Sequence, residues 1–253
     1  MLSYQTYGDA DLPPLLVAHG LFGAGRNWAT LAKKWCDIRH VVAGDMRNHG
    51  TSPHDPLHDY QALAADLAQV IDAFSGTADV LGHSMGGKAA MTLALTAPEK
   101  VGKLIIGDIA PVAYDHDQSQ FLAAMQRVDV SKITKRSDVV AALVNAGVAS
   151  DMAAFFAQSF NVSEQRWAYN LDALDENMPA ILGFPDTGTA NFEGSTLFLS
   201  GATSDYVTAA YRPHIRTLFP RARFAKLTGA GHWLHAEKPD AFEQAVRVFL
   251  TTS

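Results

Sequence analysis

Short apolar segments alternate with helical patterns along most of this chain, and this alternation constrains its fold more than any other feature. The first four segments are residues 15–18, 40–45, 78–82 and 103–108. Each is close to continuously apolar, which is typical of parallel strands that are buried on both faces. Strands that alternate with helices in this way build a mostly parallel sheet with helices on both of its faces. We therefore expect an α/β fold.

The clearest helical pattern covers residues 60–74 and follows Asp59, a residue type that commonly caps a helix. Apolar residues recur through it at helical spacing and are expected to form one buried face. These residues are Tyr60, Leu63, Leu67, Val70, Ile71 and Phe74. A last helix is expected near the carboxyl end, with Pro239 in its first turn.

Two further apolar segments, residues 195–200 and 223–227, resume the alternation toward the carboxyl end. Between residues 117 and 179 only helical patterns occur. This insertion begins at the carboxyl end of a strand, which is where open α/β sheets place their sites. We therefore expect one domain over residues 1–253, with a helical cap inserted at about residues 115–190. Core packing is the alternative interpretation of each apolar stripe taken alone.

Composition excludes several classes of protein. The net charge is −6 and no basic cluster stands out, so nucleic acid and anionic membranes are not expected as partners. No apolar run approaches the roughly 18 residues that span a bilayer, and the first residues lack the features of a secretory signal. The single cysteine, Cys36, excludes an internal disulfide. We expect a cytoplasmic protein, and composition does not bear on its oligomeric state.

The motif Gly82-His-Ser84-Met-Gly86 lies between an expected strand and an expected helix. Its glycines permit a turn too tight for side chains, which leaves the serine exposed at the edge of the sheet. The amino terminus of the following helix favours a developing negative charge at that point. The five-residue pattern alone occurs by chance in many chains, but its strand–turn–helix setting indicates that Ser84 is a catalytic nucleophile.

A serine needs a base that removes its proton during attack, and the chain offers ten histidines. His232 lies in a glycine-rich loop after the last expected strand, at the same sheet edge as the nucleophile. We therefore expect His232 to be the base, and a structural histidine is the alternative. His235 is its nearest competitor. His49 is expected to be structural, whereas His54 and His58 are expected in solvated loops.

The segment His-Gly-Leu-Phe-Gly at residues 19–23 ends the first strong strand. A backbone N–H from such a loop usually joins the N–H that follows the nucleophile to form an oxyanion hole. We assign these two donors to Leu21 and Met85. Phe22 and Trp233 are expected to be apolar walls of the substrate pocket.

Two aspartates, Asp108 and Asp205, end expected strands at the catalytic edge. In this architecture the acid most often follows the penultimate strand, three residues after a glycine. Counted from Gly201 that position is Ser204, and Asp205 comes one residue later. We favour Asp108, at the end of an earlier strand, with Ser204 as an auxiliary hydrogen-bond partner of His232 or Asp108. Asp205 is the alternative acid.

Distinctive motifs occur over nearly the whole chain, and together they resemble those of the YbfF-like bacterial esterases of the α/β-hydrolase superfamily. The pattern is also similar to that of a mammalian mitochondrial α/β-hydrolase-domain protein. The motifs are His19-Gly-Leu-Phe-Gly, Asn27-Trp28, Asp45-Met-Arg-Asn-His-Gly-Thr-Ser52, Gly82-His-Ser-Met-Gly-Gly-Lys88, Asp108-Ile-Ala-Pro111, Ser204-Asp-Tyr-Val207 and Gly231-His-Trp-Leu-His-Ala-Glu-Lys-Pro239.

This resemblance implies a small esterase for short to medium acyl chains, with a helical cap and no cofactor. It also implies an acid on the earlier strand and an extra serine, which here are Asp108 and Ser204. No spacing of histidines and carboxylates indicates a metal site. The helical insertion matches least well, and substrate choice depends largely on such a cap.

Our principal prediction is a carboxylic-ester hydrolase that acts on a small-molecule ester through Ser84, His232 and Asp108, with an acyl-enzyme intermediate. Thioesters fit the same site, and a carbon–carbon bond hydrolase is a further alternative on the same triad. Dehalogenases and epoxide hydrolases of this fold need an aspartate as the nucleophile, so Ser84 counts against both. A non-catalytic ligand-binding protein is the alternative from another class, although such proteins usually lose a member of the triad.

Overall fold

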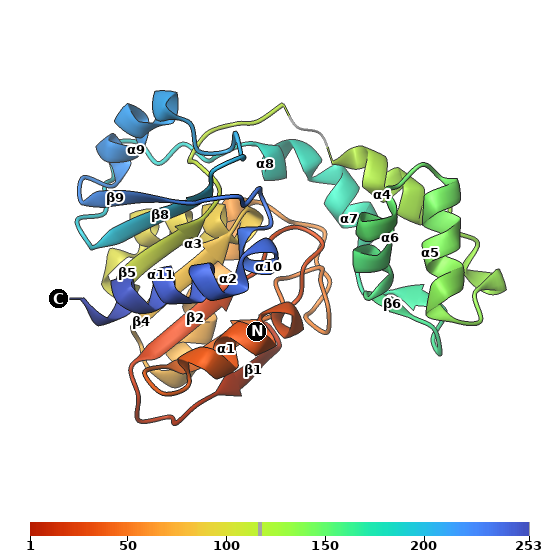
Figure 1. Ribbon diagram of the computed structural model, residues 1–253, viewed down its shortest axis with the longest axis horizontal. Coiled ribbons are helices and arrows are strands. Elements are labelled where there is room, and N and C mark those ends of the chain that lie inside the picture. The colour runs from red at the N-terminus through yellow and green to blue at the C-terminus, as the bar shows by residue number, and fades with distance from the viewer. Residues whose placement is uncertain (116–117, 253) are drawn as a thin grey trace.

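The computed structural model describes residues 1–115 and 118–252, which build a seven-stranded sheet flanked by helices (Figure 1). The strand order is β1-β3-β2-β4-β5-β8-β9, and each neighbouring pair is parallel except the antiparallel pair β1–β3. The predicted α/β fold with a mostly parallel sheet is therefore confirmed. The strands are β1 Tyr4–Tyr7, β2 Pro14–Ala18, β3 His40–Gly44, β4 Ala78–His83, β5 Val101–Gly107, β8 Thr196–Gly201 and β9 Ala222–Leu227.

Helices cover both faces of this sheet (Figure 1). The α-helices outside the insertion are α1 Ala29–Trp35, α2 Tyr60–Phe74, α3 Met85–Thr96, α9 Arg212–Leu218, α10 Leu234–Glu237 and α11 Pro239–Thr251. Short 3₁₀ turns are η1 Gly25–Trp28, η2 Pro98–Lys100, η3 Val130–Lys132 and η4 Ala209–Tyr211. The predicted cap of α2 is confirmed, because the Asp59 carboxylate accepts the N–H of Ala62 at 2.8 Å.

The core consists of two apolar layers, one on each side of the sheet. Successive residues of a strand point to opposite faces, so Leu15 packs with α1 and α11 while Leu16 packs with α2 and α3. Both side chains are almost completely buried. This double burial explains why the central strands are continuously apolar in sequence.

The helical insertion lies between β5 and β8, and we use this name for residues 119–182. Figure 1 shows α4 to α7 gathered to one side of the sheet, with α8 nearer to it. Its α-helices are α4 Ser119–Gln126, α5 Arg136–Asn145, α6 Ser150–Ala157, α7 Leu171–Glu176 and α8 Met178–Leu182.

The sequence patterns missed two pieces of antiparallel sheet. Within the helical insertion, β6 Phe160–Asn161 pairs with β7 Arg166–Trp167, and the Phe160 and Trp167 rings contact each other edge to face at 5.2 Å. Such a cross-strand aromatic pair stabilises a strand pair too short to show a periodicity. Strand β1 is half-exposed and largely polar, so it lacks the apolar pattern that identifies the inner strands.

The carboxyl ends of β4, β5, β8 and β9 bring four segments to the same edge of the sheet. Ser84 follows β4, Asp108 follows β5, Ser204 lies shortly after β8, and His232 lies in the loop after β9. Within the described parts of the chain, none of the helices has the length and apolar character that a bilayer span requires.

Candidate active site

Ser84 lies on a strained turn between β4 and α3. Its backbone has a φ of 52°, a left-handed conformation that is rare for a residue with a side chain. A Cβ atom placed on Gly82 would lie 2.2 Å from the carbonyl oxygen of Gly86, and one on Gly86 would lie 2.4 Å from that of Ala18. Only glycine fits at both positions, so the motif predicted from sequence forms the tight turn expected of it.

His232 reaches this serine from the loop after β9. Its Nε2 lies 3.1 Å from Ser84 Oγ, and its Nδ1 lies 2.8 Å from Asp108 Oδ2. Because a carboxylate accepts hydrogen bonds, Nδ1 carries the proton in the neutral ring and Nε2 is free to accept from the serine hydroxyl. The ring also stacks on Tyr206 with 4.0 Å between ring centroids, which fixes its plane.

The carboxylate that contacts His232 is that of Asp108 rather than that of Asp205, whose side chain is exposed. Asp108 is completely buried and its backbone is left-handed, with a φ of 50°. Its Oδ1 accepts the N–H of Gly201 at 3.1 Å, and its Oδ2 also accepts the hydroxyl of Ser204 at 2.5 Å. These donors compensate for burial of the negative charge.

Two backbone N–H groups beside Ser84 are available to a ligand. Among the described residues, neither Leu21 nor Met85 donates its N–H to another group. The N–H of Phe22, by contrast, donates to Nε2 of His49 at 3.2 Å. This bond occupies the N–H of Phe22, whereas the N–H groups of Leu21 and Met85 donate to no such partner among the described residues.

Phe22 has a left-handed backbone with a φ of 62°, and hydrogen bonds hold it from two sides. Its N–H donates to His49, and its carbonyl oxygen accepts the hydroxyl of Tyr169 from the helical insertion at 2.5 Å. His49 is buried, which lowers its pKa well below the usual value and keeps the ring neutral. Its Nδ1–H donates to the carbonyl of Arg47, so Nε2 remains an acceptor. The sequence patterns did not predict this contact between His49 and the loop at residues 19–23.

The prediction that His58 is solvated is wrong. Its side chain is fully buried, Nδ1 accepts from the Asn48 amide at 3.1 Å, and Nε2 lies 3.4 Å from the sulfur of Met85. Burial lowers the pKa of His58 to about 3. His54 is exposed, as expected. The two residues flank the same short loop, so composition could not distinguish the buried side chain from the exposed one.

Two further histidines support the loop that carries His232. The Nε2–H of His83, inside the serine motif, donates to the carbonyl oxygen of His232 at 2.8 Å. His235 stacks on Trp28 with ring centroids 4.6 Å apart, and burial lowers its pKa to about 4. Burial also lowers the pKa of His83 well below its usual value, so both rings are neutral. The histidine that contacts Ser84 is His232.

Ser84 and His232 open into a cavity of about 300 Å³. Phe22 and Trp233 both line it, and the helical insertion closes part of it with Phe121, Met152 and Ile181. Its other walls come from Gly20, Leu21, Tyr60, His83, Met85, Lys88, Ile109, Tyr114, Gln118, Leu182 and Tyr206.

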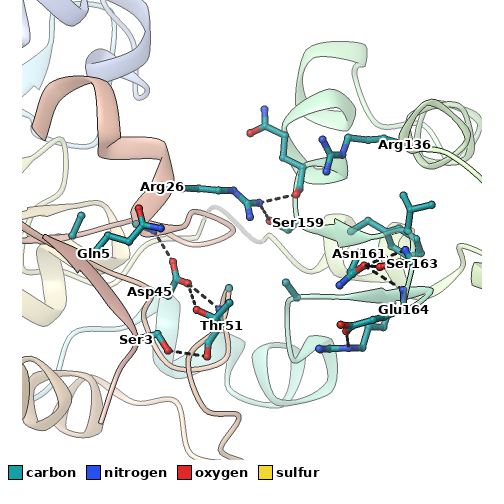
Figure 2. Close-up of a pocket in the computed structure, with 18 of the residues that line it drawn as sticks. Ser3, Gln5, Arg26, Asp45, Thr51, Arg136, Ser159, Asn161, Ser163 and Glu164 are labelled. Atoms are coloured by element: carbon teal, nitrogen blue, oxygen red, sulfur yellow. Dashed lines mark hydrogen bonds and ion pairs between the residues drawn. The ribbon is translucent and has the colours of Figure 1, made fainter. Parts of the chain in front are cut away.

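A larger cavity of about 870 Å³ lies between the amino-terminal part of the sheet and the helical insertion (Figure 2). Arg26 donates across it to the carbonyl oxygen of Gln158 at 2.7 Å and toward Ser159 Oγ at 3.5 Å. Ser84 and His232 do not line this cavity, so it is separate from the candidate site. No cluster of three or more metal-ligating side chains occurs among residues 1–115 and 118–252.

Comparison with known proteins identifies the family. The sequence profile described as "alpha/beta hydrolase fold" matches residues 13–239, most of the chain. The chain belongs to the α/β-hydrolase family. This α/β-hydrolase is 38% identical to esterase YbfF of Escherichia coli over 94% of its own length and 92% of that protein. The predicted resemblance to YbfF-like esterases is thereby confirmed.

Two other relatives support the same class of enzyme. This α/β-hydrolase is 38% identical to the sn-1-specific diacylglycerol lipase of Mus musculus, over 98% of its own length and 85% of the lipase. Among solved structures, a marine microorganism esterase superimposes with a TM-score of 0.93 at 34% identity, covering 98% of each chain. The protein is therefore a serine hydrolase-type enzyme.

Proposed function

We propose that this α/β-hydrolase cleaves carboxylic esters through an acyl-enzyme intermediate on Ser84. The observation that supports this most strongly is the unbroken chain of hydrogen bonds from Ser84 through His232 to Asp108 beside a cavity of acyl-group size. An aspartate–histidine pair in this geometry raises the nucleophilicity of a serine hydroxyl that is otherwise a weak nucleophile.

In the proposed mechanism, Ser84 Oγ attacks the ester carbonyl carbon while Nε2 of His232 removes the hydroxyl proton. The negative charge of the tetrahedral intermediate lies on the former carbonyl oxygen, which accepts the N–H groups of Leu21 and Met85. His232 then gives its proton to the leaving alcohol, and the acyl group remains on the serine. Water, deprotonated by the same histidine, releases the acid.

Asp108 keeps His232 in the productive tautomer and stabilises the imidazolium that forms during each step. Ser204 supplies a further hydrogen bond to Asp108 Oδ2, and so orients the carboxylate. Ser204 occupies the position at which this fold more often carries its acid, so we assign it the role of an auxiliary residue.

We further propose that the helical insertion is a cap over the site and that the enzyme prefers short to medium acyl chains. Three insertion side chains, Phe121, Met152 and Ile181, line the cavity that contains Ser84. A volume of about 300 Å³ is at the small end of the range for ligand pockets.

Hydrolysis of p-nitrophenyl esters of rising acyl length tests this proposal. The wild type should hydrolyse the series with a maximum at short to medium chains, and Ser84→Ala should be reduced to background. Retained activity in folded Ser84→Ala would exclude Ser84 as the nucleophile. A maximum at long chains would exclude the proposed acyl preference.

A further inference from the structure

Lys88 is a buried cation in the wall of the candidate active site. It lies one helical turn after Ser84 on α3, and the residue is only 1% exposed. It lines the same cavity as Ser84 and His232. Lysine is almost never fully buried without a partner of opposite charge, so its surroundings need an explanation.

The Lys88 ammonium contacts neutral groups. Its Nζ donates to the carbonyl oxygens of Leu182 and Gly183 at 2.8 and 2.6 Å, where α8 ends. The rings of Tyr114 and Tyr60 lie 4.8 and 5.7 Å from Nζ. Burial raises the pKa of both phenols, and each hydroxyl donates to a backbone carbonyl instead of bearing charge.

No carboxylate pairs with Lys88 among residues 1–115 and 118–252. An ammonium group has three N–H donors and two carbonyls accept from it, so among the described residues one donor has no oxygen or nitrogen acceptor. Burial without a counter-ion lowers the pKa of Lys88 to about 7. A bound anion would hold the proton on this amine.

An anchoring role explains only part of this arrangement. The two hydrogen bonds to the end of α8 join the helical insertion to the helix that carries Ser84, but a neutral amide could also make them. A buried positive charge is unfavourable unless something negative accompanies it. Among the described residues nothing negative accompanies Lys88, and a substrate bound at Ser84 would enter the same cavity.

We propose that Lys88 binds a carboxylate of the substrate, so that the preferred substrates are esters that carry a free carboxylate group. The inference rests on the proposed ester hydrolysis at Ser84. No arginine occurs among the described residues that line the cavity, and a single ammonium suits a singly charged carboxylate better than a phosphate with two charges.

The test compares matched pairs of p-nitrophenyl and alkyl esters. In one pair the charged ester is a monoester of a dicarboxylic acid such as adipic acid, so that the acyl part carries the free carboxylate. Its neutral counterpart has an isopropyl group in place of that carboxylate. In the other pair the carboxylate is on the alcohol part. The readout is the ratio of kcat/KM for the charged ester to kcat/KM for its neutral counterpart, and the two pairs show which part of the substrate Lys88 contacts.

We expect the wild type to prefer the charged ester in at least one pair. In Lys88→Gln the amide can still donate to Leu182 and Gly183 but has no charge, so the ratio should fall by about 10- to 100-fold. Lys88→Met removes both functions, and should also lower activity on the neutral esters. Lys33→Gln, which removes an exposed lysine from α1, should leave the ratio unchanged and controls for net charge.

Two results would overturn the proposal. The first is a wild-type enzyme that shows no preference for the charged ester in either pair. This measurement uses the wild type alone, so it decides the question even if Lys88→Gln does not fold. The other is an equal loss on charged and neutral esters in Lys88→Gln, which would leave Lys88 as an anchor of α8. Failure of the proposed ester hydrolysis would be detected separately, because Ser84 would then not react with a fluorophosphonate.

Discussion

Replacing Asp108 with asparagine should remove most of the activity while the fold persists. In the structure Oδ1 accepts the N–H of Gly201, whereas Oδ2 accepts both Nδ1–H of His232 and the Ser204 hydroxyl. Asparagine offers one oxygen acceptor and one NH₂ donor in the same space. Its single oxygen can therefore replace either Oδ1, which accepts from Gly201, or Oδ2, which accepts from His232 and Ser204, but not both.

The loss can be estimated from the two possible orientations of the amide. If its oxygen keeps the Gly201 bond, the NH₂ group faces His232 Nδ1, and the ring responds by holding its proton on Nε2. That nitrogen can then no longer accept the proton of Ser84. The reverse orientation directs NH₂ at the Gly201 N–H, which leaves buried donors unpaired at a cost of about 1–3 kcal/mol. Loss of tautomer control lowers kcat by about 10⁴-fold in the serine-protease triad, and we expect a similar loss here.

Steady-state kinetics with p-nitrophenyl butanoate measures this effect, with thermal unfolding as the check on folding. Asp205→Asn is the matched control, and its kcat should stay within about twofold of the wild type because its exposed side chain is not the one that contacts His232. An Asp108→Asn enzyme with more than a tenth of wild-type kcat would refute the reasoning. A large loss in Asp205→Asn alone would assign the acid to that residue.

Three other changes give independent checks. Ser204→Ala removes a hydrogen bond to the Asp108 carboxylate and should lower kcat about tenfold, measured with the same ester; an unchanged kcat would contradict an auxiliary role. Tyr169→Phe removes the hydrogen bond to the carbonyl of Phe22. This bond holds the loop at residues 19–23 rather than the substrate, so kcat should fall about fivefold with little change in KM, and a rise in KM alone would argue against this. Burial lowers the pKa of His235 from 6.5 to about 4, so the unfolded chain binds more protons between these values and stability falls as the pH drops through this window. His235→Phe also removes a buried nitrogen that has no hydrogen-bond partner among the described residues. It should therefore reduce the loss in Tm between pH 7 and pH 5, and an unchanged loss would contradict the assignment.

The inner strands, the serine turn and the histidine could be predicted from sequence because each has a local cause. Strands β2 to β5 are largely buried on both faces, and this burial makes them close to continuously apolar. At Gly82 and Gly86 any side chain would collide with backbone, so the motif itself encodes the turn. Strand β1 and the β6–β7 pair depend on tertiary contacts and have no such pattern.

The acid and the supporting residues depend on distances that sequence does not encode. Spacing left Asp108 and Asp205 as alternatives, and only the turn geometry directs the Asp108 carboxylate at His232. The burial of His58 and Lys88 could not be predicted, because it comes from the packing of segments far apart in the chain. The cytoplasmic location stays a prediction.

Reaction with a fluorophosphonate, followed by mass spectrometry of the digested protein, tests the central claim most directly. The probe reacts with a serine only where a base activates the hydroxyl, so it reports the state of Ser84 without a choice of substrate. We predict one adduct, on the peptide that contains Ser84, formed rapidly by the wild type and far more slowly by Asp108→Asn. A folded protein that remains unlabelled, or that carries the adduct on another residue, would contradict the assignment of Ser84 as the nucleophile.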